Sequence, residues 1–363
     1  MNQTYKSSII TDTRTTSDFR GCTFSQFKKI SALKELETSL LNSRIEQSCY
    51  WCAELVCSGH FIDLWDCLFM YYGKHIHSSN LNISIYLVFR LEKFKSIISE
   101  EYSENELDIR NDERIRKLFS EIICILCNAS VQYTITFVKI KVDEYNISAI
   151  SDKLKAPNIE YATQIMTPED PSELYIAVNE LAYCISYSAD HLNSRMAFFW
   201  IEWIHGYEII CKKQGNKKQG ACRIFAPVAS QRQNDIIWII WDIFINEIKL
   251  RSKKHKLSNI PNMQKVLDAF LDMFCVQYTQ SCFGRRKYIL YIIASMLCDK
   301  NVNLSKSIIT KTQKDDISRI SKNINAIYKQ IKTNENKKII HPFFYSSATN
   351  PHTNTIMMNT LTT

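Results

Sequence analysis

The residues best suited to chemistry gather in a cysteine- and histidine-rich segment, CYWCAELVCSGHFIDLWDC, at residues 49–67. Four of its side chains are of the types that bind zinc tetrahedrally: Cys49, Cys52, Cys57 and His60. However, Tyr50 and Trp51 separate the first two cysteines within a run of helical periodicity, where zinc knuckles usually bend the backbone with Gly, Pro or Asp. Because free cysteine behaves as a small buried hydrophobe, we predict core cysteines. A metal site within Cys49–His77 is the alternative.

A second candidate pair is Glu202 and His205, which the spacing Glu-x-x-His places on one face of a helix. Di-iron bundles use this motif twice, together with two further inward-facing glutamates. The sequence holds no second copy of the motif. We therefore expect a buried ion pair or hydrogen bond within an apolar helix, with iron binding as the alternative.

The glycine content argues against most catalytic loops. The chain has 7 glycines in 363 residues, whereas average usage would give roughly 25. Phosphate cradles and nucleophile turns favour glycine for its permissive backbone. Gly215 and Gly220 have the spacing of a phosphate loop, but Ala221 and Cys222 follow where Lys and Ser or Thr are required. We expect a protein that is not an enzyme and needs no cofactor.

Basic side chains form three clusters in the C-terminal half of the chain. The segment KKQGNKKQGACR is expected on an exposed loop, RSKKHK at the end of a helix and GRRK at the start of another. Residues 176–300 hold 17 Lys and Arg against 10 Asp and Glu, so +7 of the chain's net +8 lies there. The candidate binding residues are Lys212, Lys213, Lys217, Lys218, Arg223, Arg251, Lys253, Lys254, Lys256, Arg285, Arg286 and Lys287.

Cations placed in this way can neutralise the phosphates of a nucleic acid, or the carboxylates of an acidic partner. The sequence has no zinc-finger spacing, no aromatic RNA-binding motif and no recognisable helix-turn-helix, so direct reading of bases is not expected. A solvated surface, with a cationic cap on the helix expected at residues 235–250, is the alternative. Exposed aromatic residues could in addition contact partner proteins.

Apolar residues recur at helical spacing along most of the chain. Near-continuous apolar runs at residues 196–210 and 235–250 predict central helices of a bundle. Residues 131–142 differ, because apolar and polar residues alternate there and β-branched types are frequent, which predicts an extended edge strand or a packed arm. Further helices are expected at residues 23–40, 48–56, 61–72, 84–99, 112–128, 263–279 and 287–297.

The expected organisation is a mainly α, two-lobed helical bundle. We predict a flexible N-terminal tail at residues 1–22, a first helical lobe at 23–152 and a connecting loop at 153–171, where three prolines interrupt the pattern. The second lobe, with the basic clusters, is expected at 172–330. The Asn- and Thr-rich residues 331–363 are expected to form a flexible tail.

Composition also bears on the compartment. The 13 cysteines are an odd number, and residues 1–20 contain no apolar signal region. Both features favour a reducing, intracellular environment over secretion. No segment reaches the ~18 uncharged apolar residues that span a bilayer, so no membrane span is expected.

Several stretches resemble an uncharacterised protein family encoded by large DNA viruses of algae and protists. The stretches that carry the resemblance are WCAELVCSGHFIDLW (51–65), KHIH (74–77), DPSELYIAVNELAY (170–183), FFWIEWIHGYE (198–208) and IIWIIWDIF (236–244). Together they cover about half of the chain, and the similarity is one of general pattern. The resemblance implies a viral protein that works inside an infected cell, in the cytoplasm, nucleus or viral factory, or in the virion. It carries no activity or functional residue over to this chain.

The leading hypothesis is a non-enzymatic viral accessory protein of assembly, replication or transcription. Its basic C-terminal lobe would contact nucleic acid or an acidic partner, including other viral proteins. One alternative is a structural or scaffold protein of the virion. Another is a zinc- or iron-binding protein that uses the Cys49–His77 segment or the Glu202 and His205 pair.

Overall fold

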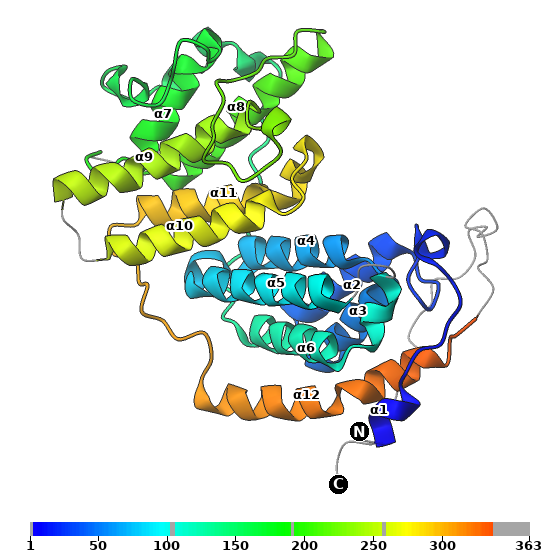
Figure 1. The fold of residues 1–363 in the computed structure, drawn as a ribbon. Helices are drawn as coiled ribbons and strands as arrows, with labels where there is room; N and C mark the ends of the chain where they lie inside the picture. Colours follow the sequence, from blue (N-terminus) through cyan, green and yellow to red (C-terminus); the bar gives the residue numbers. More distant parts are fainter. Residues whose placement is uncertain (1–2, 102–105, 190–191, 256–258, 337–363) are drawn as a thin grey trace.

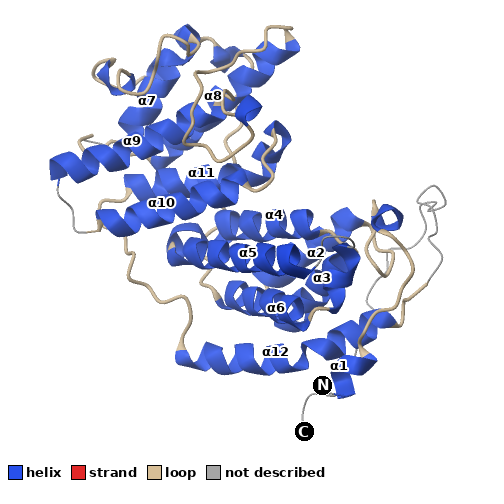
Figure 2. Cartoon of the chain, viewed as in Figure 1, coloured by secondary structure: helices blue, strands red, loops and turns tan. Residues whose placement is uncertain are grey.

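Helices form nearly all the regular structure of the computed structural model, which describes residues 3–101, 106–189, 192–255 and 259–336 (Figure 2). Within these ranges there is no β-sheet, and only an isolated bridge joins Cys22 and Lys28. The predicted mainly α fold is confirmed. None of the described helices is both long enough and apolar enough to cross a membrane.

The first lobe combines helices from both ends of the chain (Figure 1). Helices α3 and α6 contribute many apolar side chains to its core. In the second half of each helix, nearly every residue is buried. Asp112 caps α6 by accepting a hydrogen bond from the Arg114 amide at 2.7 Å. The helices are α1 (Gln3–Ser7), α2 (Lys29–Leu41), α3 (Ile45–Cys57), α4 (Phe61–Tyr71), α5 (Asn82–Glu101), α6 (Glu113–Asn128) and α12 (Lys311–Lys332).

The second lobe is built around α9, whose N-terminal half is buried on nearly every face. Trp238 and Trp241 of this helix both pack edge-on against Phe274. The predicted central role of the apolar runs at residues 196–210 and 235–250 is therefore confirmed. The helices are α7 (Tyr175–Ile185), α8 (Ser194–Lys213), α9 (Ile237–His255), α10 (Ile260–Cys275) and α11 (Phe283–Cys298).

Helix α12 was expected within the second lobe but packs against α6 and α3 of the first (Figure 1). Its buried face includes Ile324, Tyr328 and Ile331. The Arg116 guanidinium of α6 lies 4.0 Å from the centre of the Tyr328 ring and donates to Asn325 Oδ1 at 2.9 Å. The chain thus returns to its first lobe after α11, and the predicted boundary at residue 330 is wrong.

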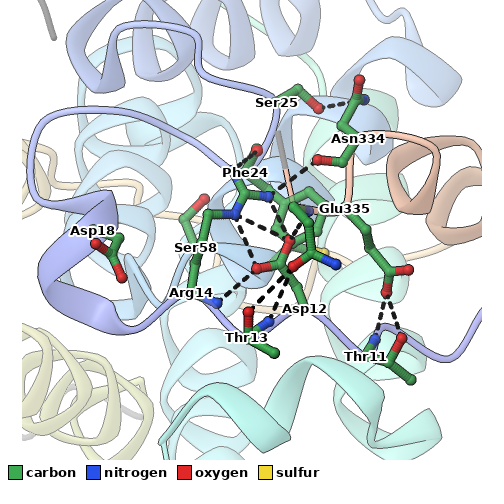
Figure 3. A network of polar contacts seen from close by, with 12 residues as sticks. Thr11, Asp12, Thr13, Arg14, Asp18, Phe24, Ser25, Ser58, Asn334 and Glu335 are labelled. Carbon is green, nitrogen blue, oxygen red and sulfur yellow. Dashed lines mark hydrogen bonds and ion pairs between the residues drawn. The ribbon is translucent and has the colours of Figure 1, made fainter. Parts of the chain in front are cut away.

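The N-terminal segment was predicted to be a flexible tail, but residues 3–22 are fixed to the first lobe. Ile10 and Phe19 are buried, and Arg14 forms an ion pair with Asp12 at 2.6 Å. Figure 3 shows this pair beside the end of α12, where the Asn336 amide donates to Asp12 Oδ2 at 2.8 Å. The polar side chains of this segment therefore form hydrogen bonds with the residues that follow α12. Residues 337–363 of the predicted C-terminal tail lie outside the described residues.

Residues 131–142 form an extended arm that leads out of the first lobe. The arm is held by the π-helical turn η2 (Tyr72–Ile76), because the Gln132 and Ile135 amides donate to the carbonyl groups of His75 and Lys74 at 3.3 and 2.8 Å. Ile135 is its buried anchor. The segment is neither of the two forms expected: it forms no strand, and its apolar side chains Val131, Tyr133 and Phe137 are exposed rather than packed.

The two lobes meet where α10 packs on α5 and α11 packs on α4 (Figure 1). At this contact, Asp66 of α4 accepts hydrogen bonds from Arg286 Nη2 at 2.7 Å and Arg285 Nε at 2.8 Å. Asp66 and Arg286 are both almost fully buried. Gly73 permits the close approach, since a Cβ atom there would lie 2.8 Å from the Tyr288 Cβ.

We expect Asp66→Asn to lower the free energy of unfolding by about 3–5 kcal/mol, because it leaves the buried Arg286 guanidinium without its counter-charge. Urea denaturation followed by circular dichroism measures this loss. Asp316→Asn, in an exposed pair with Arg319, is the matched control and should change stability by less than about 0.5 kcal/mol. An equal, small effect of both substitutions would contradict the proposed importance of the Asp66 pair.

Candidate nucleic-acid interface

The connection between α8 and α9, residues 214–236, is the most distinctive surface segment of the second lobe. It is longer than the ~12–15 residues that most structureless loops reach, and loops of such length are usually functional when ordered. Between Glu208 and Asp235 the chain has no Asp or Glu. The six cations of this stretch are Lys212, Lys213, Lys217, Lys218, Arg223 and Arg232. We call residues 212–234 the basic loop.

Backbone hydrogen bonds close the basic loop on itself. The Gly220 amide donates to the Asn234 carbonyl at 2.9 Å, and the Arg223 amide donates to the Gln233 carbonyl at 3.0 Å. The Asn234 side chain returns a hydrogen bond to the Gly220 carbonyl at 3.2 Å. Glycine is required at position 220, because a Cβ atom there would lie 2.9 Å from Asp170 Oδ1. The loop is thus a fixed platform for its exposed side chains.

A buried ion pair anchors the basic loop. Arg223 donates to both carboxylate oxygens of Asp170, at 2.6 and 2.8 Å, and to Asp242 Oδ2 of α9 at 3.2 Å. Burial raises the pKa of Asp170, but the hydrogen bonds from Arg223 and from the Thr167 and Ala221 amides outweigh burial and lower it overall. Arg223 was expected to be exposed and to contact phosphate. It is only 5% exposed, so that prediction is wrong.

The remaining cations of the loop differ in their freedom to bind a partner. Lys212, Lys213 and Lys217 are exposed, and none of them forms an ion pair with a described residue. Lys218 pairs with Glu173 at 2.6 Å, and Arg232 is half-buried. Ile224, at the outer edge of the loop, is 85% exposed. Three lysines and one apolar side chain therefore project from the anchored loop.

The other predicted basic residues do not join this surface. Arg251 is buried and pairs with Glu247 at 2.7 Å, and Arg286 is buried against Asp66, so both predictions of an exposed cation are wrong. Lys287 is mostly buried and lies 3.1 Å from Glu202. Arg285 is exposed but pairs with Asp66.

Lys253 and Lys254 are exposed, but at the C-terminal end of α9. The basic loop leads into the N-terminal end of this helix, which lies roughly 27 Å away at 1.5 Å per residue. Lys256 lies outside the described residues. A single continuous basic face is therefore not formed by the described members of the predicted set.

Two buried carboxyl groups, Glu208 and Asp235, lie at the base of the loop. The Gln280 side-chain amide donates to both of them, at 3.1 and 2.9 Å. Burial raises the pKa of Glu208 to about 7, with a further contribution from Asp235. Burial also raises the pKa of Asp235. Near neutral pH, the base of the loop therefore carries less negative charge than two free carboxylates would.

The cysteine segment forms core rather than a converging ligand set. Cys49, Cys52 and Cys57 are buried, which confirms the prediction of core cysteines. Burial raises the pKa of the Cys52 and Cys57 thiols, which disfavours the thiolate form that binds metals. The His60 Nε2 atom lies 2.8 Å from the Cys22 carbonyl oxygen instead. Among the described residues, no group of three or more Cys, His, Asp or Glu side chains is placed to hold a metal ion.

The side chains of Glu202 and His205 have different partners. Tyr291 donates to Glu202 Oε1 at 2.5 Å, so the expected buried hydrogen bond is present, although with a different partner. His205 stacks on Phe283 with ring centres 3.5 Å apart, and its Nδ1 atom lies 3.8 Å from Glu208 Oε2. Burial lowers the pKa of His205 to about 4, so the ring is neutral at physiological pH. The pair does not form an iron site.

The residues that hold the basic loop in place were not among those expected from the sequence. Asp170 and Asp242 come from elsewhere in the chain, so no local pattern pairs them with Arg223. The absence of acidic residues between Glu208 and Asp235 is visible in the sequence, but it does not distinguish the basic loop, because the other two clusters lie in acid-free stretches at residues 248–267 and 273–298. Comparisons with family models, curated proteins and solved structures gave no match for this chain.

Arg223→Gln should loosen the basic loop, because the Asp170 carboxylate then remains buried without its partner. Limited trypsin digestion of the native protein, read by mass spectrometry, is expected to cut after Lys212, Lys213, Lys217 or Lys218 at least about tenfold faster than in the unchanged protein. Arg232→Gln removes a half-buried cation of the same loop and is the control. Equal cleavage rates in all three proteins would contradict the anchoring role of Arg223.

Glu208 should make stability depend on pH. Its pKa in the folded protein, about 7, lies above the ordinary value of 4.5, so the folded state retains a proton that the unfolded state has lost. Stability is therefore expected to fall as pH rises from 4.5 to about 7. Glu208→Gln should remove this loss, worth up to about 3 kcal/mol, as measured by urea denaturation at pH 4.5 and 8. The control is Glu35→Gln, at an exposed position of α2; identical pH profiles for both variants would be inconsistent with a buried, protonated Glu208.

Proposed function

We propose that this protein is a non-catalytic nucleic-acid-binding protein that contacts phosphates through its basic loop. The observation that carries the proposal is the exposure of Lys212, Lys213 and Lys217 at the end of α8 and in the following loop, which the buried pair of Arg223 and Asp170 anchors. Lysine binds phosphate as a point charge. Because the loop is held by buried contacts, little conformational entropy is lost when it binds.

Polar side chains among the lysines support contact with a sugar–phosphate backbone. Gln214, Asn216 and Gln219 are exposed and carry amide groups that can donate hydrogen bonds to phosphate oxygens. The loop presents no helix or strand that could enter a groove and read base edges. Binding should therefore depend on phosphate charge and little on sequence.

The setting of this activity follows from the resemblance to proteins of large DNA viruses. In that setting the protein would act as an accessory of viral assembly, replication or transcription inside the infected cell. A scaffold role in the virion is the second candidate; it would require stoichiometric amounts of the protein in purified particles. The metal-binding alternative has no support from the arrangement of its candidate residues.

The salt dependence of binding tests the proposal. Fluorescence anisotropy with a labelled 30-base-pair DNA duplex, and with an RNA duplex of equal length, should give an affinity whose logarithm falls with the logarithm of salt concentration. Three lysine–phosphate contacts give a slope of about −3 for DNA. The triple variant Lys212→Gln, Lys213→Gln, Lys217→Gln should lose most of this slope and bind at least about tenfold more weakly at low salt.

A variant with the same change in charge provides the control. Lys249, Lys253 and Lys254 are exposed near the other end of α9, and their joint replacement by Gln should leave the salt dependence largely unchanged. Equal losses in both triple variants would mean that net charge alone attracts DNA, and would overturn the assignment to the loop. Tighter binding of polyglutamate than of either duplex would assign the loop to an acidic protein partner instead.

A further inference from the structure

A cavity of about 300 Å³ lies in the second lobe, and the carbonyl group of its lining residue Ile165 accepts a hydrogen bond from Arg223 of the basic loop at 3.3 Å. One wall is the segment that connects the lobes, which contributes Tyr161 and Gln164. The opposite walls are the end of α7, with Ser186, and the middle of α9, with Asn246 and Glu247. The predicted connecting loop at 153–171 is thus also one side of a half-open pocket. Ile165 and Ile243 provide buried apolar surface within it.

Four polar side chains of the lining have no internal partner. Gln164, Ser186, Ser188 and Asn246 line the cavity, and none of their side chains forms a hydrogen bond with another described residue. Ser186 is nevertheless buried, at 9% exposure. Gln164 and Ser188 are exposed and Asn246 is half-buried, so their amide and hydroxyl groups are open to solvent or to a ligand. Amide and hydroxyl groups both donate and accept hydrogen bonds, so this set suits a ligand that does the same.

The charges in the cavity are balanced. Glu247 is buried, but Arg251 donates to its Oε1 atom at 2.7 Å and the Tyr187 amide donates to the same atom at 2.8 Å. At the exposed rim, Glu160 and Lys254 carry opposite charges. Among the described lining residues, an anionic ligand would face two carboxylates, Glu160 and Glu247, and one exposed cation, Lys254. A cationic ligand would lie near Glu247, whose negative charge Arg251 already neutralises. A neutral ligand avoids both conflicts.

We infer that this cavity binds a neutral, hydroxyl-rich small molecule, such as a monosaccharide or the ribose of a nucleoside. The hydroxyl groups of such a molecule match the unpaired amide and hydroxyl groups of Gln164, Ser186 and Asn246. Its carbon skeleton can pack on Ile165, Ile243 and the ring of Tyr161. The cavity volume lies at the lower end of the range for small-molecule sites, which suits a ligand of this size. The inference is independent of nucleic-acid binding by the basic loop.

Isothermal titration calorimetry and saturation-transfer NMR can test the site with three probes: adenosine, methyl α-glucopyranoside and adenosine monophosphate. At least one neutral probe should bind with a Kd of about 1 mM or tighter. Binding of adenosine alone would identify a ribose or nucleoside, and binding of the glucoside alone would identify a pyranose. Tighter binding of the monophosphate than of adenosine, or no binding of either neutral probe at about 10 mM, would overturn the inference.

Asn246→Leu should lower the affinity for the neutral probe by at least about tenfold, because it replaces a hydrogen-bonding amide with an apolar group of similar size. Ser186→Ala is a smaller change that tests the same site if the first variant folds poorly. Asn262→Leu, on the exposed face of α10, is the control and should bind as the unchanged protein does. Equal affinity in all variants, with native circular dichroism spectra, would place binding elsewhere and contradict the inference.

Discussion

Five arginine side chains are buried among the described residues, and each forms hydrogen bonds with segments that are distant in the sequence: Arg110, Arg116, Arg223, Arg251 and Arg286. Arg286 joins the two lobes through Asp66, and Arg223 fixes the basic loop through Asp170. Arg251 joins α9 to the ends of α7 and α11 through the Ile185 and Leu297 carbonyl groups. Arg116 pairs with no carboxylate of the described residues, but its Nε and both Nη atoms donate hydrogen bonds to neutral oxygens. A guanidinium group can be buried only when such partners are complete.

This constraint explains which parts of the site could be predicted. Helical periodicity and the core cysteines are local properties, so the main helices and the burial of Cys49 could be predicted. The sequence alone does not show whether an arginine side chain is buried or exposed. Its partner is remote: Asp66 precedes Arg286 by 220 residues. The sequence therefore assigns Arg223, Arg251 and Arg286 to a surface that they do not share.

The ends of the chain illustrate the same limit. The segment before residue 22 is polar, which predicts a mobile tail, but its polar groups meet the end of α12 through Asp12 and Arg14. Likewise, residues 311–330 were expected in the second lobe because they follow it in the sequence, but α12 packs on α6 and α3 of the first lobe. Once the arginines are assigned to the interior, two groups of exposed lysines remain in the second lobe: Lys212, Lys213 and Lys217 beside the anchored loop, and Lys249, Lys253 and Lys254 near the other end of α9.

Residue-resolved chemical labelling tests this division between interior arginines and exposed lysines most directly. The native protein is treated with phenylglyoxal for arginine and an acetylating reagent for lysine, and modification is read by mass spectrometry. We expect Arg116, Arg223, Arg251 and Arg286 to react at least about tenfold more slowly than the exposed Arg195. Lys212, Lys213 and Lys217 should react rapidly and become protected when duplex DNA is added. Rapid modification of the four arginines, at the rate of Arg195, would contradict the account.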